Sequence, residues 1–286
     1  MKKFFIGATI GVAAISLAAC GDGATPTDGT TAKSDLTLEQ VFDKAMERQE
    51  NLQSTKATMT MEQGTTMTIE GEEVHMTSST NMDMSMTAKP LALIADGTMS
   101  MTMADEEETL EMPLKMYLTE EDGFYMNDVM GEGWLKLPND MYKDMLAQAG
   151  ANADASEQLK QLEPFIDDFT FEQTDAAYVL TLNAIGEEFH ELILDQVTGT
   201  MAQQLGEEGQ SLFEGIQFED AKYIITIDKK TFDITKMDLD FVMTMDVEGV
   251  IAKANTTSTI IYSDFDSVDT ITIPQDVLDT AVESAF

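Results

Sequence analysis

The chain has 286 residues and carries 53 acidic against 16 basic side chains, which gives a net charge of −37 at neutral pH. This charge excludes nucleic acid as a partner, because binding to phosphates requires clusters of Lys and Arg. It also argues against docking of the protein surface on anionic lipid head groups.

The first twenty residues predict a lipoprotein signal peptide. Lys2 and Lys3 precede an uncharged apolar run from Phe4 to Leu17, and small residues then lead to Cys20 in the sequence LAAC. The run is shorter than the roughly 20 residues of a membrane span, and its ending is typical of a cleavage site. We expect Cys20 to be acylated and to anchor the protein outside the cell membrane; the alternative is a short transmembrane anchor. Because no other cysteine exists, the exported part has no disulfide and no catalytic thiol.

Residues 21–35 are rich in Gly, Thr, Asp and Pro, which predicts a flexible tether. Residues 36–286 predict a single α+β domain. Thr37 and Gln40 form a capping box, and the apolar residues after them recur at helical spacing. The sequence therefore predicts one amphipathic helix that ends near Gln53.

After this helix, apolar residues recur at every second position, which predicts long strands with one apolar and one polar face. The runs end near Ile69, Ala88, Met103 and Leu118. The Asp-Gly pair at 96–97 would ordinarily predict a hairpin, but the odd-numbered apolar positions continue on both sides of it. We predict one continuous strand here, in a sheet whose single apolar face must curl and be covered.

The rest of the chain predicts shorter strands that alternate with helices. The predicted strands span 124–130, 134–137, 169–174, 178–183, 223–227, 237–247 and 256–265, the predicted helices span 139–168, 189–205 and a segment after Pro274, and 213–218 stays ambiguous. This order predicts an antiparallel sheet of about ten strands and a few helices that cover its apolar face.

Five stretches carry a family resemblance. They are the lipobox at Cys20, LTLEQVFDKAMERQENLQ, MYLTEEDGFYMNDVMGEGWLKLP, YIITIDKKTFDITKMDLDF and IIYSDFDSVDTITIPQDVLDTA. Together they resemble uncharacterised lipoproteins of Gram-positive bacteria and, through these, the LolA/LppX-like lipid-carrier superfamily. The resemblance implies a strongly curved antiparallel half-barrel whose concave apolar face is covered by helices, where some members carry lipids or lipoprotein acyl chains. It assigns no lipid-contacting residue in this chain.

The sequence predicts no catalytic residue, no metal site and no cofactor. Its two histidines, His75 and His190, lie on different predicted elements without the spacing of a metal or catalytic motif. We expect His75 to be a surface residue and His190 to pair with neighbouring glutamates on a helix. The acidic runs lack the spacing of a calcium loop, and the chain has no nucleophile elbow or phosphate-binding glycine loop. We therefore expect a protein that is not an enzyme.

The 22 methionines are the most unusual part of the composition, and many occupy apolar positions of the predicted strands. Methionine is flexible and adapts to varied apolar shapes, so these positions predict a face that binds an apolar ligand. Thioethers also bind Cu(I), but here methionine and leucine alternate along several strands instead of forming one local cluster. The candidate residues of the apolar-ligand face are Met82, Met84, Met86, Met99, Met101, Met103, Met112, Met116, Met243 and Met245.

These observations lead to one main hypothesis and two alternatives. The main hypothesis is an extracytoplasmic lipoprotein that binds a lipid or acyl chain in a methionine-lined groove. Its partners are then the bilayer, through acylated Cys20, and the apolar ligand. The first alternative is a structural or interaction lipoprotein with a closed, methionine-rich core and no ligand. The second, less favoured, is a methionine-rich copper-binding protein.

Overall fold

The computed structural model describes most of the predicted strands and part of the predicted helices. The signal peptide with Cys20, the predicted helix at 189–205 with His190, and most of the predicted helical region 139–168 lie outside the described residues. The described residues are 23–27, 34, 36–69, 71–103, 109–128, 133–138, 142, 162–184, 216–247 and 250–283.

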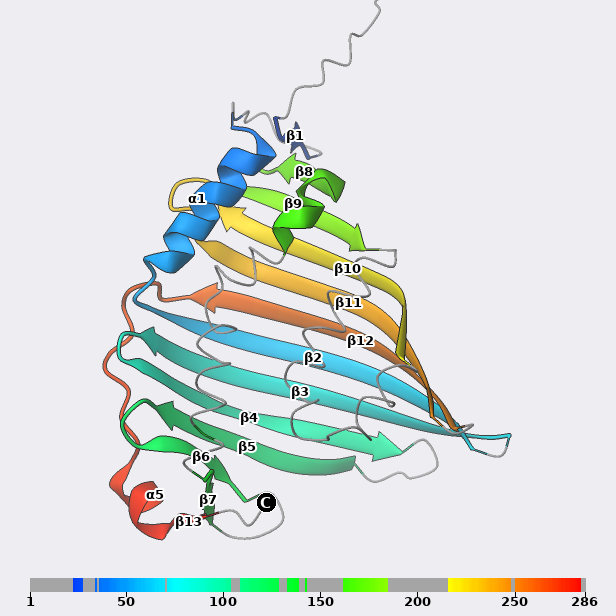
Figure 1. Cartoon of the computed structure of the whole chain (residues 1–286), viewed down its shortest axis with the longest axis vertical. Coiled ribbons are helices and arrows are strands. Elements are labelled where there is room, and N and C mark those ends of the chain that lie inside the picture. Colours follow the sequence, from blue (N-terminus) through cyan, green and yellow to red (C-terminus); the bar gives the residue numbers. More distant parts are fainter. Residues whose placement is uncertain are drawn as a thin grey trace, which may run out of the picture.

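Thirteen strands form one sheet in the order β1-β8-β9-β10-β11-β12-β2-β3-β4-β5-β6-β7-β13 (Figure 1). Neighbouring strands are antiparallel, except that β1 pairs with β8 and β13 with β7 in parallel. The strands are β1 (Thr25–Pro26), β2 (Ser54–Ile69), β3 (Glu72–Ala88), β4 (Leu91–Met103), β5 (Thr109–Thr119), β6 (Gly123–Asn127), β7 (Trp134–Lys136), β8 (Phe169–Gln173), β9 (Ala177–Ala184), β10 (Ile216–Asp228), β11 (Ile234–Val247), β12 (Val250–Ser263) and β13 (Val282–Glu283).

Three helices are described: α1 (Leu38–Glu50), the 3₁₀ helix η1 (Glu163–Asp168) and α5 (Gln275–Thr280). The predicted start of α1 is confirmed, because the Gln40 backbone N–H donates to Thr37 Oγ1 at 3.2 Å and the Thr37 N–H donates to Gln40 Oε1 at 3.1 Å. None of the described helices combines the length and the apolar character that crossing a membrane requires.

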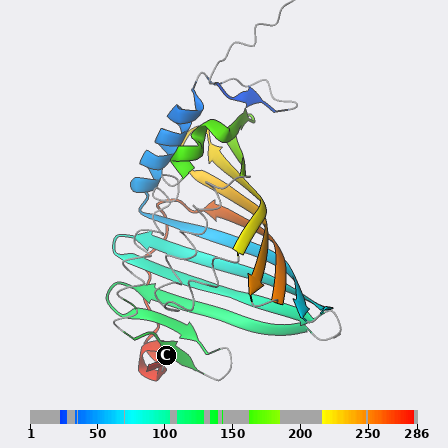
Figure 2. The ribbon, with the colours of Figure 1, turned by 45° about the vertical axis from the view of Figure 1, so that its right-hand side comes forward.

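The prediction of long strands is confirmed, and the prediction of the sheet's shape only in part. The strand β4 runs without a turn through the Asp-Gly pair at 96–97, as the apolar parity predicted. The sheet has more than the predicted ten or so strands, and it is open and not strongly curled, in contrast to the predicted half-barrel. Figure 2 shows how the strand direction rotates from β10 to β5. The regular twist between neighbouring strands therefore accumulates across the sheet instead of closing it.

Residues 23–27, which belong to the predicted tether, lie against the edge of the sheet. The side-chain amide of Gln173 is 1% exposed and donates from Nε2 to the Ala24 carbonyl at 2.7 Å. The Thr27 N–H donates to the Gln173 carbonyl at 2.9 Å, and Lys229 Nζ donates to Gln173 Oε1 at 2.8 Å. A polar residue in the interior thus holds this segment through a satisfied hydrogen-bond network.

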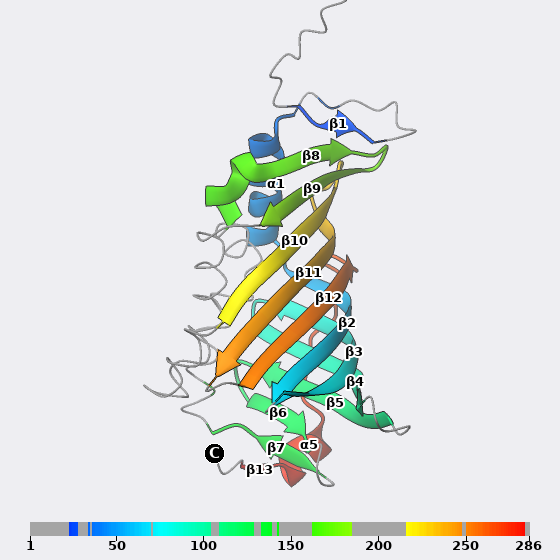
Figure 3. The ribbon, with the colours of Figure 1, turned by 90° about the vertical axis from the view of Figure 1, so that its right-hand side faces the viewer.

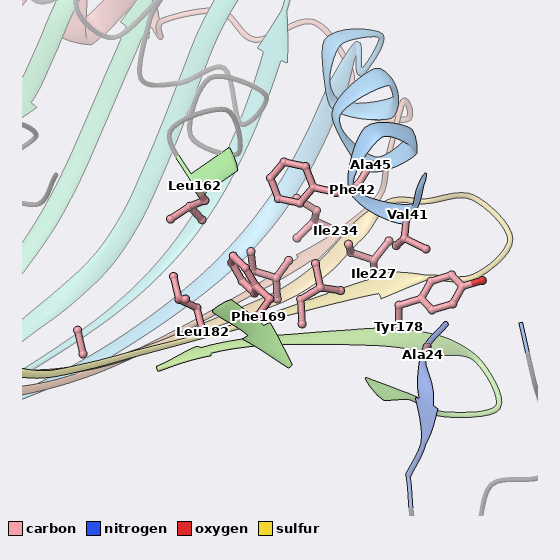
Figure 4. Packing of buried hydrophobic residues seen from close by; sticks show 13 residues of the cluster. Ala24, Val41, Phe42, Ala45, Leu162, Phe169, Tyr178, Leu182, Ile227 and Ile234 are labelled. Atoms are coloured by element: carbon pink, nitrogen blue, oxygen red, sulfur yellow. The ribbon is translucent and has the colours of Figure 1, made fainter. Parts of the chain in front are cut away.

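Two apolar cores lie on opposite faces of the sheet, at its two ends (Figure 3). In the first, Val41, Phe42 and Ala45 of α1 pack on strands β8 to β11 (Figure 4). In the second, Val277 of α5 packs on Tyr117 of β5 and on β6 from the other side. The expectation that helices cover the apolar face is therefore met by α1, whereas the closing helix α5 covers the opposite face.

Candidate functional site

Backbone pairing places most of the 22 methionines on one face of the sheet. Met59 on β2 pairs with Met82 on β3, and Met99 on β4 pairs with Met112 on β5. Directly paired residues point to the same side, so the register can be followed from strand to strand. The resulting methionine face carries Met59, Met61, Met67, Met76, Met82, Met84, Met86, Met99, Met101, Met103, Met112, Met116, Met126, Met237, Met243 and Met245.

All ten methionines predicted from the sequence lie on this face. They extend over β3, β4, β5 and β11 and do not meet at one point. Met82 is 8% exposed, Met103 is 47% exposed, and the others are half-buried. Leu110 on β5 is 59% exposed, so the face is open at the end of the β4–β5 pair. Cys20, the predicted lipidation site, lies outside the described residues.

The methionine face is almost uncharged, although the chain is strongly acidic. Among the described strand residues, Glu72 at the start of β3 is the only charged side chain on this side. The strand lysines point to the other side, which we call the charged face. They are Lys56, Lys115, Lys136, Lys222, Lys236 and Lys253. An anion on the methionine face would therefore find no cation on the described strands.

The methionine face has two parts of different composition. Where α1 packs, the buried side chains are Val, Ile, Leu, Phe, Tyr and Ala, and methionine contributes only at the margin of the cluster through Met46 and Met237. On β2 to β5 methionine is the most frequent residue of the same face, with leucine, alanine and small polar residues beside it. Branched and aromatic side chains specify one packing arrangement, whereas methionine accepts many. The sequence thus changes side-chain type along one continuous surface.

Two tyrosine hydroxyl groups on this face are shielded from water. Tyr223 on β10 and Tyr262 on β12 lie on its inner strands, and burial raises the pKa of each phenol to about 12. The Tyr262 hydroxyl donates to Met237 Sδ at 3.6 Å. Both phenols therefore stay neutral at physiological pH, and they add polar but uncharged groups to the apolar surface.

A group of small polar residues interrupts the methionine face near the middle of the sheet. These residues were not predicted as part of a site, although the sequence holds a signal: positions 63 and 65 fall between Met61 and Met67, at positions where the alternation would place apolar residues. We call them the neutral polar patch. Its members are Gln63, Thr65, Ser78, Thr80, Thr256 and Ser258.

The charged face is hollowed near the middle of the sheet. A cavity of about 470 Å³ opens there between β12, β2, β3, β4 and β5, lined mostly by hydroxyl and amide groups, with Glu62 as its one carboxylate. At the far end of the same face, His75 is exposed and contacts Thr66 Oγ1 at 2.9 Å, as a surface histidine would. Within the described part of the chain, no three His, Cys, Asp or Glu side chains gather as metal ligands.

Comparisons with solved structures give remote likenesses. A DUF1329 family protein from Desulfovibrio piger has 10% identity and a TM-score of 0.20, with 82% of this chain and 95% of that chain covered. A β-barrel-like DUF1849 protein from Brucella abortus has 12% identity and a TM-score of 0.19, with 72% and 98% covered. The translocator domain of the autotransporter NalP from Neisseria meningitidis has 8% identity and a TM-score of 0.21, with 77% and 93% covered. TM-scores this low support no conclusion about this chain.

A comparison with curated proteins gives no match. One family model, in contrast, matches residues 37–282, from the cap of α1 to the start of β13. The match includes the whole methionine face, the second core and all of the first core except Ala24 and Leu36. The chain therefore belongs to DUF6612, a family of unknown function.

Proposed function

We propose that this protein binds a lipid or another ligand with a long apolar chain on the methionine face, and that acylated Cys20 anchors it outside the cell membrane. The observation that carries the proposal is the change of composition along one uncharged surface. Branched and aromatic residues predominate where α1 packs, whereas methionine is the most frequent residue of this face on β2 to β5. A surface that must accept flexible ligands favours methionine for its adaptability.

The competing hypothesis is a closed core in which the protein's own residues fill the space over the methionines. Such a core would gain stability and a unique packing from Ile, Val and Phe, which the chain uses freely beneath α1. The core beneath α1 therefore shows which side chains this sequence uses for permanent packing. Strands β2 to β5 use methionine more often than that core does.

The first experiment asks whether lipid is present. The chain from Gly21 onward, which keeps every residue that the structure describes, is purified without detergent. Solvent extraction and mass spectrometry should recover lipid in an amount close to that of the protein. Diphenylhexatriene, an uncharged probe that fluoresces in apolar surroundings, should be taken up after the lipid is removed. Repeated absence of both signals contradicts the proposal, and stoichiometric copper in the same preparation would favour the copper alternative.

The second experiment locates the site with two neighbouring residues of β4. Met99 points to the methionine face, and Thr98 points to the charged face. Met99→Lys should lower uptake of the probe severalfold, because it places a charge on the uncharged surface. Thr98→Lys adds the same charge on the other side and should leave uptake unchanged. Equal effects of the two variants would place the ligand elsewhere.

A further inference from the structure

The neutral polar patch lies within the uncharged part of the methionine face. Thr256 on β12 pairs with Gln63 on β2, and Gln63 pairs with Ser78 on β3. In the next row, Ser258 and Thr80 flank Met61 in the same way. Cross-strand neighbours of this kind lie about 5 Å apart, so the polar groups form a continuous surface over three strands.

Hydrogen bonding within the patch is incomplete. Gln63 Nε2 donates to Thr256 Oγ1 at 3.2 Å, so the buried Thr256 hydroxyl accepts one hydrogen bond. Thr80 is only 5% exposed, and among the described residues its hydroxyl makes no side-chain hydrogen bond. The side-chain carbonyl of Gln63 likewise receives no hydrogen bond from the described residues. Buried polar groups are normally paired, so the buried Thr80 hydroxyl has capacity for a further partner, and the half-buried Gln63 carbonyl can accept another hydrogen bond beside it.

The described strand residues favour an uncharged partner. No lysine of the described strands reaches the methionine face, and its only charged residue, Glu72, lies at the start of β3 opposite Ile69. A carboxylate or phosphate head group placed here would lose its water without gaining a cation, which costs free energy. Hydroxyl and ester groups, in contrast, match the hydroxyls and the amide of the patch.

Methionines continue from the patch along the strands. From Thr80 to Met86 the strand β3 extends about 20 Å at roughly 3.3 Å per residue, and Met82, Met84 and Met86 point to the same face. A polar group bound at Thr80 would therefore sit at one end of an apolar track long enough for an acyl chain. The arrangement matches an amphiphile with a small head and a long tail.

We propose that the neutral polar patch binds the uncharged head group of a glyceride, such as a monoacylglycerol or diacylglycerol, whose acyl chain lies on Met82, Met84 and Met86. This inference rests on the proposed function and specifies its ligand class. It disfavours free fatty acids and phospholipids as ligands, because their anionic heads find no cation among the described strand residues of this face.

The test compares three ligands with the same apolar length: monoolein, oleate and octadecene. Each is titrated at pH 8 against diphenylhexatriene bound to the chain from Gly21 onward. Monoolein should displace the probe at about 3- to 10-fold lower concentration than octadecene, the factor expected for one added hydrogen bond. Oleate should be weaker than monoolein by at least as much.

Matched variants then assign the preference to the patch. Thr80→Val keeps the shape of the side chain and removes the hydroxyl, so it should abolish the preference for monoolein over octadecene. Thr77→Val makes the same change on the charged face of β3 and should preserve it. Gln63→Leu provides a second test if Thr80→Val does not fold.

The outcomes separate the two proposals. Equal displacement by monoolein, oleate and octadecene, or a preference that survives both Thr80→Val and Gln63→Leu, overturns the assignment of a glyceride head and leaves the apolar-ligand function standing. Failure of all three ligands and of the probe itself to bind contradicts both.

Discussion

Gly97 on β4 lies directly against Met82 on β3, so close that a Cβ at position 97 would be 2.8 Å from the Met82 Cα and would overlap the Asn81 carbonyl oxygen. These atoms belong to the backbone and cannot move aside as a flexible side chain could. Glycine is therefore required here by close approach of two strands, in the middle of the methionine face.

Replacing this glycine should separate the strands. We expect Gly97→Ala to lower the free energy of unfolding by about 2 kcal/mol, the usual cost of forcing a group into a filled space. Gly64→Ala on β2 is the control, because a Cβ there meets nothing within 4 Å. The control should be neutral or slightly stabilising, since alanine restricts the unfolded chain. Urea unfolding of both variants measures the difference, and equal stabilities would contradict the close contact.

Arg48, the only arginine in the chain, connects α1 to two distant turns. Its Nε donates to Asp233 Oδ1 at 2.6 Å and its Nη2 to Asp266 Oδ2 at 2.7 Å. Asp233 is 7% exposed, so Arg48→Ala would leave a buried carboxylate without its partner. We expect a loss of about 2–3 kcal/mol.

The control for Arg48 is an ion pair with similar geometry but more water around it. Lys56 and Asp264 are 2.7 Å apart and both half exposed, so Lys56→Ala should change the unfolding midpoint little. Thermal unfolding, followed by circular dichroism, compares the two variants. If they lose the same stability, the buried position of Asp233 has no role.

Acid should remove part of this stability. Burial alone would raise the pKa of Asp266, but hydrogen bonds from the Gln53 backbone N–H and from Arg48 outweigh it and hold the pKa below its ordinary value of 3.8. Because the folded-state pKa is the lower one, the stabilisation is present above the unfolded-state pKa and is lost as pH falls through the folded-state value.

The measurement is the unfolding midpoint between pH 7 and pH 2 in about 1 M salt, which screens the general repulsion among the carboxylates. We expect the midpoint to decrease below about pH 4. The variant Asp266→Asn should have a lower unfolding midpoint at pH 7. Its midpoint should decrease less on acidification, because asparagine has no carboxylate to protonate. Parallel curves for the two proteins would show that Asp266 does not contribute.

The adaptability of the methionine face can be tested without changing its polarity. Met84→Leu, Met99→Leu and Met116→Leu conserve volume, so each should cost less than about 1.5 kcal/mol. Together they should narrow the range of apolar chain lengths that displace the fluorescent probe, because leucine has fewer conformations. The control makes the reverse change on the same face, Leu93→Met together with Leu118→Met, and should not narrow the range of chain lengths. If the triple variant binds the same range as the original protein, the methionines only fill a core and do not adapt to a ligand.

Local patterns predicted the elements well where each residue's role depends on its near neighbours. The capping box at Thr37 and Gln40 and the unbroken parity across 96–97 both have this property, and both are confirmed. Period-2 alternation also predicted which side each methionine faces. The pairing of β12 with β2 joins segments about 200 residues apart, and no local signal contains it.

The shape of the sheet and the position of the last helix were not predictable in the same way. Curvature depends on how twist accumulates over thirteen strands, which no single strand encodes. The apolar residues of α5 fit either face, and only the contact of Val277 with Tyr117 decides that it packs on the charged side. The neutral polar patch required the register: positions 63 and 65 interrupt the apolar parity of β2, but only the pairing shows that residues of β3 and β12 join them.

The pairing of β1 with β8 has a consequence for how the molecule would stand on a membrane. Gly23 forms a bridge with Thr37 just before α1 and lies two positions before the first residue of β1, and only Gly21 and Asp22 separate it from Cys20. The three Cα–Cα steps from Cys20 to Gly23 span at most about 11 Å. An acyl anchor at Cys20 would therefore keep the β1–β8 edge next to the lipid head groups. The sheet would then extend away from the bilayer, and the methionine face would be roughly perpendicular to the membrane surface instead of facing it.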